Sequence, residues 1–595
     1  QVNNRLAPNG ALIQGADVTL IAGQDLKNSG TLRATNNLSA KATNDLVNSG
    51  LVEAGGRLDL LAGNNIVNKA GGVISGRDVS LVTTAGDVVN ERTITATGDN
   101  THLHREYVDS AARIEAANDL SIKTGRDFIS NGGVLVSGRD TSINAGRDVS
   151  IATAEQRNSS TLGKQTSSIT QYGSTLDAGR DLTISAGRDL AAIASQIDAK
   201  RDVSMSAKDD LTLASAADEQ HSLSRSKRVT TQEDHVRQVS TVVTAGGNVT
   251  LNAGKDLGLI ASRVSAGDEA YLVAGANLVL QSAEDSDYSF YSKTKKSSSG
   301  KKFQLDEASS VTNVASSVTS GGNNVLTAGN DLMIKGSNVI SEKGGVGLNA
   351  GNDVEIVAVT DSESARHERS KSKSSWGGLK SSKVQDKLAE TLTTAVGSMI
   401  SGDTIAVIAK RDATVTGSAL VSTNDLAVRA GRDLTIDAAE NTFSRTQMHK
   451  EKNRDLTGVL TGNNLGLDDI TGNQHLSISN QKHNGTASQT TLTGSTIGSS
   501  KGNVSLVAGG DLNVIASDLV STKDMSLRGS NVTIAAGMET AAQSTVDKSN
   551  SLAVGRVVGG AIIDTVNTIR SSVEAAKDAD DPRLKAVKLA QAALA

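Results

Sequence analysis

Short runs of alternating apolar and polar residues recur along most of the chain, and many of them end at a turn of the type Gly-Arg-Asp. In one such run Leu182 and Ile184 point to one side of an extended strand, and the polar residues beside them point to the other. A period of two is typical of a half-buried β-strand. The pattern therefore predicts a chain built mainly of short strands, each with one apolar face.

The strands and turns repeat about every 21 residues. The turn acids Asp181 and Asp189 recur as Asp202 and Asp210, each 21 residues later. The same offset separates Asp119 and Asp140, Asp127 and Asp148, Asp256 and Asn277, Asp412 and Asp433, and Asn503 and Asp524. A unit this short cannot bury a core by itself, so neighbouring units must stack. The chain is therefore expected to be a solenoid.

Three short strands and three turns fill about 20–22 residues, the length of one coil of a β-helix. One period after Leu182 and Leu190, Val203 and Leu211 occupy the same positions. We expect each of these pairs to stack at the strand spacing of about 4.8 Å. The predicted fold class is all-β: a right-handed parallel β-helix, or β-solenoid, with polar side insertions and a short helical C-terminal tail.

The acidic residue in each turn is predicted to be structural. Glycine supplies the positive φ of a sharp bend, and an Asp side chain can accept a hydrogen bond from the backbone just after it. Stacked acids ~5 Å apart repel one another by about 1 kcal/mol in water, and the Arg that precedes many of them can neutralise the column. The turn positions expected to act in this way are Asp127, Asp148, Asp181, Asp189, Asp202, Asp210 and Asp433.

Neither a metal site nor a catalytic site is predicted. Calcium-binding β-helices use glycine-rich repeats of nine residues, whereas the long period here is 21. His102, His104 and Glu106 could hold a metal, but their spacing is common by chance and no His-Glu-x-x-His is present. A P-loop and a Cys–His pair are also missing from the sequence. We expect no catalytic residue, no cofactor and no bound metal.

Polar insertions interrupt the coils over residues 90–117, 151–176, 214–244, 281–321, 358–401 and 437–500. Most of them open with an acidic residue, such as Glu219, Glu284 or Asp361, and together they hold all eight His and most of the aromatic residues. Strands that are polar on both sides cannot lie in a core. We therefore expect the insertions to form hairpins or flaps along one side of the solenoid.

One insertion carries a patch in which aromatic and basic residues alternate, and a nearby Trp extends it. The patch comprises Tyr288, Phe290, Tyr291, Lys295, Lys296 and Trp376. Two interpretations stay open, solvated decoration or a surface that contacts glycan, lipid or protein. Such interleaving also occurs in proteins that bind single-stranded nucleic acids. It occurs once here, in a chain with a formal net charge of −5, so no nucleic-acid partner is predicted.

Composition excludes several other classes of protein. The 595 residues include only four Phe and one Trp, so Val, Leu, Ile and Ala must fill the core. No cysteine is present, which excludes disulfides and thiolate metal sites. No apolar run reaches the ~18 residues of a membrane span. No signal peptide is recognised either, and we expect the chain to be part of a longer protein.

From Leu552 the apolar period becomes helical, with Ile562, Val566, Ile569 and Val573 on one stripe. Asp581 followed by Pro582 predicts an N-cap and the start of a second short helix. This tail is expected to be either a cap on the solenoid or the start of a following domain.

The Ala-Gly-(Arg/Asn/Lys)-Asp-Leu-Thr-Ile repeats, the Asn-Ser-Gly units near the N-terminus and the Ser/Lys-rich insertions together resemble filamentous haemagglutinins. These are the large exoproteins of bacterial two-partner secretion. The insertion-bearing blocks are most similar to the second haemagglutinin-repeat region of contact-dependent growth inhibition exoproteins. The resemblance covers about residues 1–540. It implies a β-helical stalk, exported through an outer-membrane barrel transporter, in a protein that carries a variable C-terminal toxin.

By this resemblance the chain is expected to be a non-enzymatic stalk that mediates cell contact and delivers a toxin across a target-cell outer membrane. The implied partners are the barrel transporter during export and the target-cell surface or outer membrane. The implied state is a monomeric filament, secreted and placed at the bacterial cell surface or held in the periplasm before delivery. Two alternatives stay open: a plain filamentous adhesin that binds host or cell-surface glycans, and a β-helix enzyme that cleaves polysaccharide.

Three regions are expected along the chain. Residues 1–100 are predicted to form a β-helix of regular short repeats, and residues 101–540 a β-helix of haemagglutinin repeats with polar insertions. Residues 541–595 are predicted to form the helical tail, as a cap or as a junction before the toxin.

Overall fold

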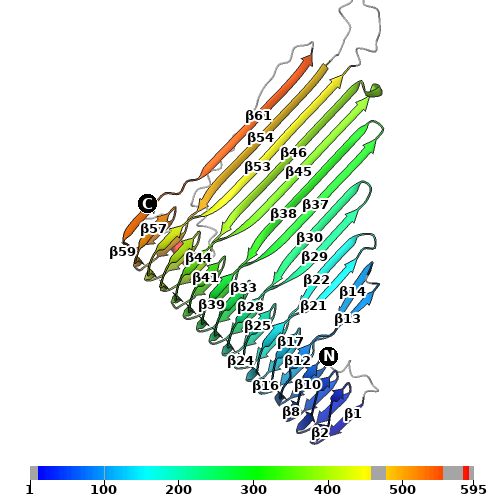
Figure 1. The fold of residues 1–595 in the computed structure, drawn as a ribbon, viewed down its shortest axis with the longest axis vertical. Helices are drawn as coiled ribbons and strands as arrows, with labels where there is room; N and C mark the ends of the chain where they lie inside the picture. Colours follow the sequence, from blue (N-terminus) through cyan, green and yellow to red (C-terminus); the bar gives the residue numbers. More distant parts are fainter. Residues whose placement is uncertain (1–10, 100, 457–476, 554–580, 588–595) are drawn as a thin grey trace, which may run out of the picture.

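A computed structural model describes residues 11–99, 101–456, 477–553 and 581–587, which wind as a parallel β-helix (Figure 1). Each coil contributes one short strand to each of three long sheets, and every strand pairs in parallel with strands of adjacent coils. The all-β solenoid expected from the 21-residue offset is confirmed. Within the described residues each sheet has 16 strands, so the coils rise over roughly 70 Å at the usual strand spacing.

The strands of the three coil sheets share a length of three to six residues. The first sheet comprises β1 (Leu12–Gly15), β4 (Thr31–Ala34), β7 (Leu51–Ala54), β10 (Val73–Gly76), β15 (Arg113–Ala116), β18 (Val134–Ser137), β23 (Thr175–Ala178), β26 (Gln196–Ala199), β31 (Val242–Ala245), β34 (Arg263–Ala266), β39 (Ser317–Ser320), β42 (Asn338–Ser341), β47 (Met399–Gly402), β50 (Ala419–Ser422), β55 (Thr496–Ser499) and β58 (Asp518–Ser521). The second sheet comprises β2 (Val18–Ala22), β5 (Leu38–Ala42), β8 (Arg57–Ala62), β11 (Asp78–Thr83), β16 (Leu120–Thr124), β19 (Thr141–Ala145), β24 (Leu182–Ala186), β27 (Val203–Ala207), β32 (Val249–Ala253), β35 (Ala270–Ala274), β40 (Asn324–Ala328), β43 (Val346–Ala350), β48 (Ile405–Ala409), β51 (Leu426–Ala430), β56 (Val504–Ala508) and β59 (Met525–Arg528). The third sheet comprises β3 (Leu26–Asn28), β6 (Leu46–Asn48), β9 (Ile66–Asn68), β12 (Val88–Glu91), β17 (Phe128–Asn131), β20 (Val149–Ala152), β25 (Leu190–Ile193), β28 (Leu211–Ala214), β33 (Leu257–Ile260), β36 (Leu278–Gln281), β41 (Leu332–Lys335), β44 (Val354–Val357), β49 (Ala413–Thr416), β52 (Leu434–Asp437), β57 (Asp511–Ile515) and β60 (Asn531–Ala535).

The apolar positions of each strand face a common interior. In β24 the residues Leu182, Ile184 and Ala186 are buried, and the residues between them are exposed or half-buried. Leu182 pairs with Val203 of the next coil, and Leu190 pairs with Leu211, as the sequence offset predicted. The buried residues form one continuous cluster along the coils, so a narrow column of Leu, Ile, Val and Ala serves as the core.

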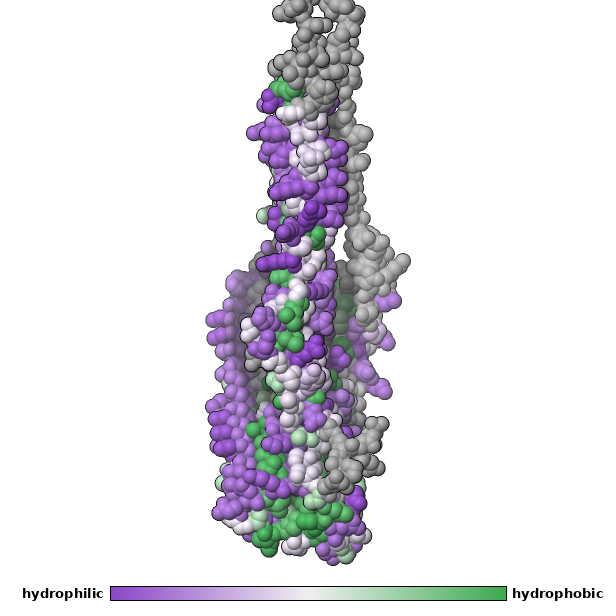
Figure 2. Space-filling model, turned by 90° about the vertical axis from the view of Figure 1, so that its right-hand side faces the viewer, coloured by the Kyte–Doolittle hydropathy of each residue, from purple (hydrophilic) through white to green (hydrophobic). Residues whose placement is uncertain are grey.

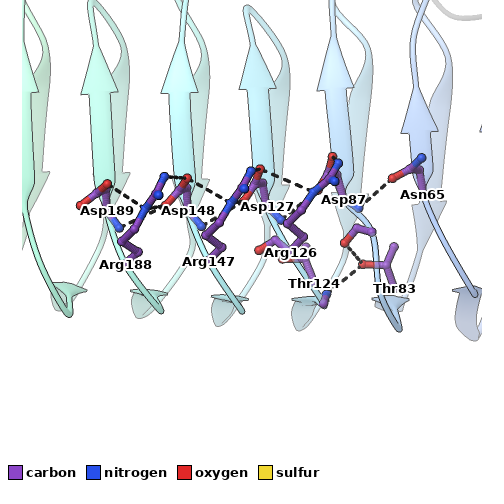
Figure 3. Close-up of polar contacts among 12 residues, drawn as sticks. Asn65, Thr83, Asp87, Thr124, Arg126, Asp127, Arg147, Asp148, Arg188 and Asp189 are labelled. Carbon is purple, nitrogen blue, oxygen red and sulfur yellow. Dashed lines mark hydrogen bonds and ion pairs between the residues drawn. The ribbon is translucent and has the colours of Figure 1, made fainter.

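Turn acids stack in a column where each coil passes from the second sheet to the third (Figure 3). Arg126 Nε lies 2.7 Å from an Asp87 carboxylate oxygen, and Arg147 Nε lies 2.8 Å from Asp127. Each guanidinium therefore binds the acid of the preceding coil. The backbone N–H of Asp148 donates to Asp127 in the same direction, at 3.2 Å. Arginine and backbone N–H groups together offset the repulsion that stacked carboxylates would otherwise exert.

Other turn acids singled out from the sequence accept backbone hydrogen bonds in the same way. Asp148, Asp189 and Asp433 lie at this corner, whereas Asp181 and Asp202 lie at the corner between the first sheet and the second. The carboxylates of Asp148, Asp181, Asp189 and Asp433 accept the backbone N–H groups of Asp189, Asp202, Asp210 and Asp511, respectively. A hydrogen bond from a neighbouring guanidinium lowers the pKa of several turn acids below its ordinary value. These acids are Asp87, Asp140, Asp181, Asp353 and Asp412.

A second polar column lies inside the coil, and sequence reasoning did not assign it. In the first coils the Nδ2 groups of Asn28, Asn48 and Asn68 donate to the side-chain oxygen of the next asparagine, at 2.8–2.9 Å, and the column ends at Asn90. Asn48, Asn68 and Asn90 are at most 1% exposed. Asn48 and Asn68 have an amide partner on both sides, and the end members Asn28 and Asn90 also bond to the backbone, so the cost of burying these amides is offset by hydrogen bonds.

Polar insertions form hairpins that pair with one another in a fourth sheet, which we call the side sheet (Figure 1). Its strands are antiparallel, and within the described residues there are 13 of them. They are β13 (Ile94–Gly98), β14 (Leu103–Val108), β21 (Ala154–Ser160), β22 (Gln165–Tyr172), β29 (Ala216–Arg225), β30 (Val229–Val239), β37 (Ala283–Ser297), β38 (Gly300–Val314), β45 (Val359–Ser375), β46 (Lys380–Val396), β53 (Ala439–Asp455), β54 (Ser477–Thr493) and β61 (Thr540–Ala553). A 3₁₀ turn, η2 (Trp376–Gly378), joins β45 and β46. Hairpins were expected from the sequence, but their pairing into one sheet was not.

Each hairpin leaves the coil between the third sheet and the first, and from β14 onward two coils separate one hairpin from the next. In the intervening coil the same corner is closed by one residue with positive φ, such as Ala194, Ala261, Gly336 or Gly417. At Gly336 a Cβ atom would lie 2.4 Å from Val359 Cγ2, so glycine is needed there. The corner thus alternates between a tight closure and a hairpin.

The C-terminal part departs from the helical tail expected for residues 541–595. Thr540–Ala553 form strand β61 and pair with β54, so the expectation was wrong for these residues. Their polar and small side chains continue the alternation of the side sheet. The stripe from Ile562 to Val573 lies outside the described residues.

A short helix over residues 582–587 starts at the expected cap. Asp581 Oδ1 accepts the N–H groups of Arg583 and Leu584, at 2.8 and 3.0 Å. The helix packs on the flank of the coils, where Val587 contacts Val421 and Val520. Arg583 also donates to the carbonyl oxygens of Ser341 and Glu342, at 2.8 and 2.6 Å.

Adjacent residues of β24 provide a matched test of the coil. Leu182→Asp places an unpaired carboxylate in the core and is expected to destabilise its coils by about 4 kcal/mol. Thr183→Asp adds the same charge on the exposed side and is expected to change stability by less than about 0.5 kcal/mol. Hydrogen exchange of the β24 and β27 amides reports both values locally. Equal loss of protection in the two variants would contradict the assigned register.

Candidate functional surface: the side sheet

The side sheet is a single layer with both faces open to solvent. In the side-sheet strands among β29 to β54, the one buried apolar side chain of the described residues is that of Val359, where β45 leaves the coil. Seen from the side, the upper part of the molecule is a narrow column on which polar residues predominate (Figure 2). Hydrogen bonds and cross-strand side-chain pairs must therefore hold this sheet together, because it has no apolar core of its own.

The strands lengthen along the chain, from seven residues in β21 to 17 in β45, β46, β53 and β54. A 17-residue strand reaches roughly 55 Å from the coil. The sheet therefore presents a large surface to solvent, and it carries most of the histidine, aromatic and charged side chains of the insertions.

The aromatic–basic patch singled out from the sequence is divided between the two faces of this sheet. We name the faces after neighbouring residues of β37, the Asp287 face and the Tyr288 face. Since side chains alternate along a strand, Tyr288, Phe290 and Lys296 lie on the Tyr288 face. Tyr291 and Lys295 lie on the Asp287 face. Trp376 lies in η2 at the tip of the next hairpin, and its side chain is outside the described part.

Successive hairpins are joined at their bases by a repeated set of hydrogen bonds, which we call the base clasp. Ser282 donates to the side-chain oxygen of Asn313 at 2.8 Å. The Asn313 side chain donates to the Thr360 carbonyl at 3.0 Å, and its backbone N–H donates to Asp361 at 2.8 Å. The same set recurs with Ser215, Gln238, Glu284 and Asp285, and with Thr153, Gln171, Ala217 and Asp218.

The opening acids noticed in the sequence lie at this clasp, although only some of them accept a clasp hydrogen bond. Asp361 was singled out and accepts one. In the two preceding hairpins the acceptors are Asp218 and Asp285, neighbours of the noticed Glu219 and Glu284. An amide residue recurs as the penultimate residue of the second strand in three successive hairpins, as Gln171, Gln238 and Asn313, and this recurrence could have revealed the clasp.

Every histidine in the described residues is paired with a carboxylate of the side sheet or its connecting loops. On the Asp287 face the acid stands directly across from the histidine on the neighbouring strand. His235 Nδ1 lies 2.6 Å from Asp287, and His367 Nδ1 lies 2.9 Å from Asp306. One row of four strands carries Asp386, His449, His483 and Asp547 in succession.

These pairs shift the acid–base properties of the sheet. Hydrogen bonds from His235 and Arg237 lower the pKa of Asp287, and a hydrogen bond from His367 lowers the pKa of Asp306. On the Tyr288 face, burial acts against protonation of His221, but its hydrogen bonds to Glu219 and Asp234 raise its pKa above the ordinary value. The carboxylates thus serve as partners of cations within the sheet.

The arrangement does not assemble a metal centre from the described residues: no group of three His, Cys, Asp or Glu side chains converges there. His102 is paired with Asp99, and His104 with Glu106. A hollow of about 600 Å³ on the sheet is lined by three acids, by small residues and by several larger side chains. The acids are Asp287, Glu363 and Glu390, and the larger side chains are His235, Tyr288, Leu392 and Phe443. The Asp287 carboxylate is occupied by His235 and Arg237.

Comparison with known proteins agrees with this architecture. The family model described as "Hemagglutinin repeat" matches residues 158–232, 222–306, 298–387, 378–535 and 476–581, which together cover more than half of the chain. The first three matches each run from one hairpin of the side sheet to the next, so the repeat unit is a hairpin with its two coils.

Several curated proteins are similar over most of the chain. The "16S rRNA endonuclease CdiA" of Enterobacter cloacae subsp. cloacae is 30% identical over 601 residues, covering 98% of this chain and 15% of that protein. The "tRNA nuclease CdiA" of Escherichia coli strain STEC_O31 is 27% identical over 600 residues, covering 98% and 16%. The "Deoxyribonuclease CdiA" of Dickeya dadantii is 28% identical over 540 residues, covering 88% and 13%. The chain thus spans about a sixth or less of the length of these relatives.

No solved structure matches the chain. Among the residues described here, none of the helices has the length and apolar character needed to cross a lipid bilayer.

His221 makes the side sheet sensitive to pH. Because its pKa is raised in the folded sheet, the stability it contributes is fully present below about pH 6.5, the unfolded value, and is lost as the pH rises through the folded pKa. Amide protection factors of β29 and β30 are therefore expected to be higher at pH 5.5 than at pH 8 (both about one unit or more from the unfolded value). His221→Gln, which cannot titrate, should remove this difference. A difference that persists in His221→Gln would refute the assignment.

Proposed function

This chain belongs to the hemagglutinin-repeat family, and from that membership we propose that it is the β-helical stalk of a secreted two-partner exoprotein. In this proposal the stalk mediates contact with a target cell and helps to deliver a C-terminal toxin across that cell's outer membrane. Export through an outer-membrane barrel transporter and placement at the bacterial surface belong to the same proposal. The names of the relatives support it, since they describe nucleases and CdiA proteins.

The single observation that carries the proposal is the side sheet. A rigid stack of coils holds hairpins at fixed intervals and joins them in a two-faced polar surface without an apolar core. Such a surface suits many weak contacts spread over one large partner, which act together through effective concentration. A catalytic site would need one convergent group of residues, whereas the carboxylates of the coil recur turn after turn in bonds to arginine.

The relatives are named as nucleases, but the chain aligns with only about a sixth or less of each relative's length, so those names do not require nuclease activity in the aligned part. We therefore assign the nuclease activities in those names to other parts of those proteins and propose that this chain is not itself an enzyme. A plain adhesin remains the alternative, because the same surface could hold a cell without passing a toxin.

Replacing one hairpin in the full exoprotein tests the proposal. Residues 282–315 can be exchanged for a single alanine, because Ala261 closes the same corner in the preceding coil. The coils should then stack as before, and the side sheet should be interrupted. We expect growth inhibition of target cells to fall about tenfold or more, as expected when linked contacts are broken, while export and surface display stay unchanged.

A matched control is Lys335→Gln, which changes an exposed coil residue outside the side sheet and should leave inhibition intact. Full inhibition by the hairpin replacement would contradict a role of the side sheet in delivery. Attachment to cells without any growth inhibition by the parent protein would favour the plain adhesin and overturn toxin delivery.

A further inference from the structure

Hairpin tips in the middle of the side sheet are strongly basic. Residues 293–304, at the turn between β37 and β38, contain five Lys and no Asp or Glu. Residues 369–385, at the turn between β45 and β46, contain four Lys and one Arg, again without an acid. The preceding tip adds Arg225, Lys227 and Arg228. We call these three segments the basic tip region.

Lysines in this region stand directly opposite one another across strands. On the Asp287 face, Lys302 pairs in register with Lys295 on one side and with Lys371 on the other. Like charges in direct cross-strand register destabilise a sheet. On the Tyr288 face Lys296 pairs with Lys301. Beyond the basic tip region, Lys482 on the same face pairs with Lys450 on one side and with Lys548 on the other. Because this unfavourable Lys–Lys pairing is repeated, we infer that an anionic ligand binds between the lysines and offsets their repulsion.

The chain offers these cations little internal compensation. Among the described residues of the basic tip region, the one ion pair joins Lys380 to Asp455, at 2.9 Å. The coil arginines differ, since Arg147 and its equivalents each bind a turn acid. The acids that flank these segments along the strands are already paired: Asp306 and Asp386 with histidines, and Glu368 with Arg366 and Lys387.

A surface hollow of about 720 Å³ lies within this region. Five cations line it, Lys293, Lys295, Lys302, Arg369 and Lys371, together with one acid, Asp386, which is hydrogen-bonded to His449. All five are exposed, so an anionic group can reach several of them together. The hairpin tips lie along one edge of the molecule, on the right-hand side of Figure 1 and away from the coils.

We propose that the basic tip region binds phosphate-bearing lipid headgroups at a membrane surface. Clusters of Lys and Arg bind anionic membrane surfaces through the summed attraction of many charges. An extended line of hairpin tips can meet a planar layer of headgroups at several points. A nucleic-acid strand would also be expected to use stacking aromatic side chains, and the three segments contain only Phe303 and Trp376.

This inference deepens the proposed function and rests on it for the place of contact, the outer membrane of a target cell. It adds the chemical nature of the partner: the basic tip region of the side sheet recognises the negative charge of the membrane surface. Contacts of this kind weaken when salt screens them, because the charges are exposed.

Binding to vesicles tests the inference with the whole chain. One set of vesicles is phosphatidylcholine alone, and the other is an equal mixture of phosphatidylcholine and phosphatidylglycerol. The wild-type chain is expected to co-sediment with the mixed vesicles only, and less so as salt is raised. The triple variant Lys295→Gln, Lys302→Gln and Lys371→Gln should lower this affinity about tenfold or more.

The control carries the same loss of charge on exposed coil strands: Lys41→Gln, Lys123→Gln and Lys335→Gln. Its affinity for the mixed vesicles should stay at the wild-type value. Circular dichroism of the tip variant should match that of the wild type, and amide protection of its side sheet should be equal or higher, because the variant removes destabilising like-charge pairs.

Three results would overturn the inference: equal binding to both kinds of vesicle, equal losses in the two triple variants, or competition by millimolar inorganic phosphate that abolishes vesicle binding. Tighter binding of single-stranded DNA than of mixed vesicles would also overturn it, in favour of a nucleic acid. None of these results decides the proposed function, whose test is hairpin replacement in the parent protein. Loss of vesicle binding by the tip variant alone would support the inference.

Discussion

Backbone hydrogen bonding sets neighbouring strands about 4.8 Å apart, and this spacing governs both parts of the molecule. In the coil it is the rise from one turn to the next, and in the side sheet it is the width of one strand. A hairpin has two strands, so it needs two coils of rise beneath it, and two coils separate each hairpin from the next. The match allows separate insertions to meet as one sheet with every inner strand paired.

The two parts are stabilised in different ways. The coil buries a column of aliphatic side chains and balances its turn acids with arginine. The side sheet has no comparable core, and it relies on strand pairing, His–carboxylate pairs and the base clasp that ties each hairpin to the next. Because the coil fixes the bases of the hairpins, much of the entropy of bringing them together is already lost before they pair. Polar faces then remain free for partners, and the basic tip region gives part of this surface a strong positive charge.

The sequence predicted the coil well because its apolar alternation and turn chemistry agree. Leu182 and Val203 hold equivalent places in a 21-residue repeat, and they pair. The hairpins were also predicted, but strands such as β37 are polar on both sides and carry no pattern that sets a register. The aromatic–basic patch therefore was treated as one cluster, although Tyr288 and Tyr291 lie on opposite faces. The helix after Asp581 could be predicted because its capping hydrogen bond is local in sequence. The strand Thr540–Ala553 could not, because it depends on pairing with β54, which is distant in sequence.

Deleting coils tests the spacing rule most directly. Deletion of residues 194–214 removes one coil and joins Ile193 to Ser215. Ile193 then takes the place of Ala214, with which it pairs in the intact chain. Deletion of residues 153–214 removes a hairpin with its two coils. Hydrogen exchange should show protected coil sheets in both variants, but loss of side-sheet protection next to the deletion only in the first. A side sheet that stays protected after the one-coil deletion, or is lost after the two-coil deletion, would contradict the account.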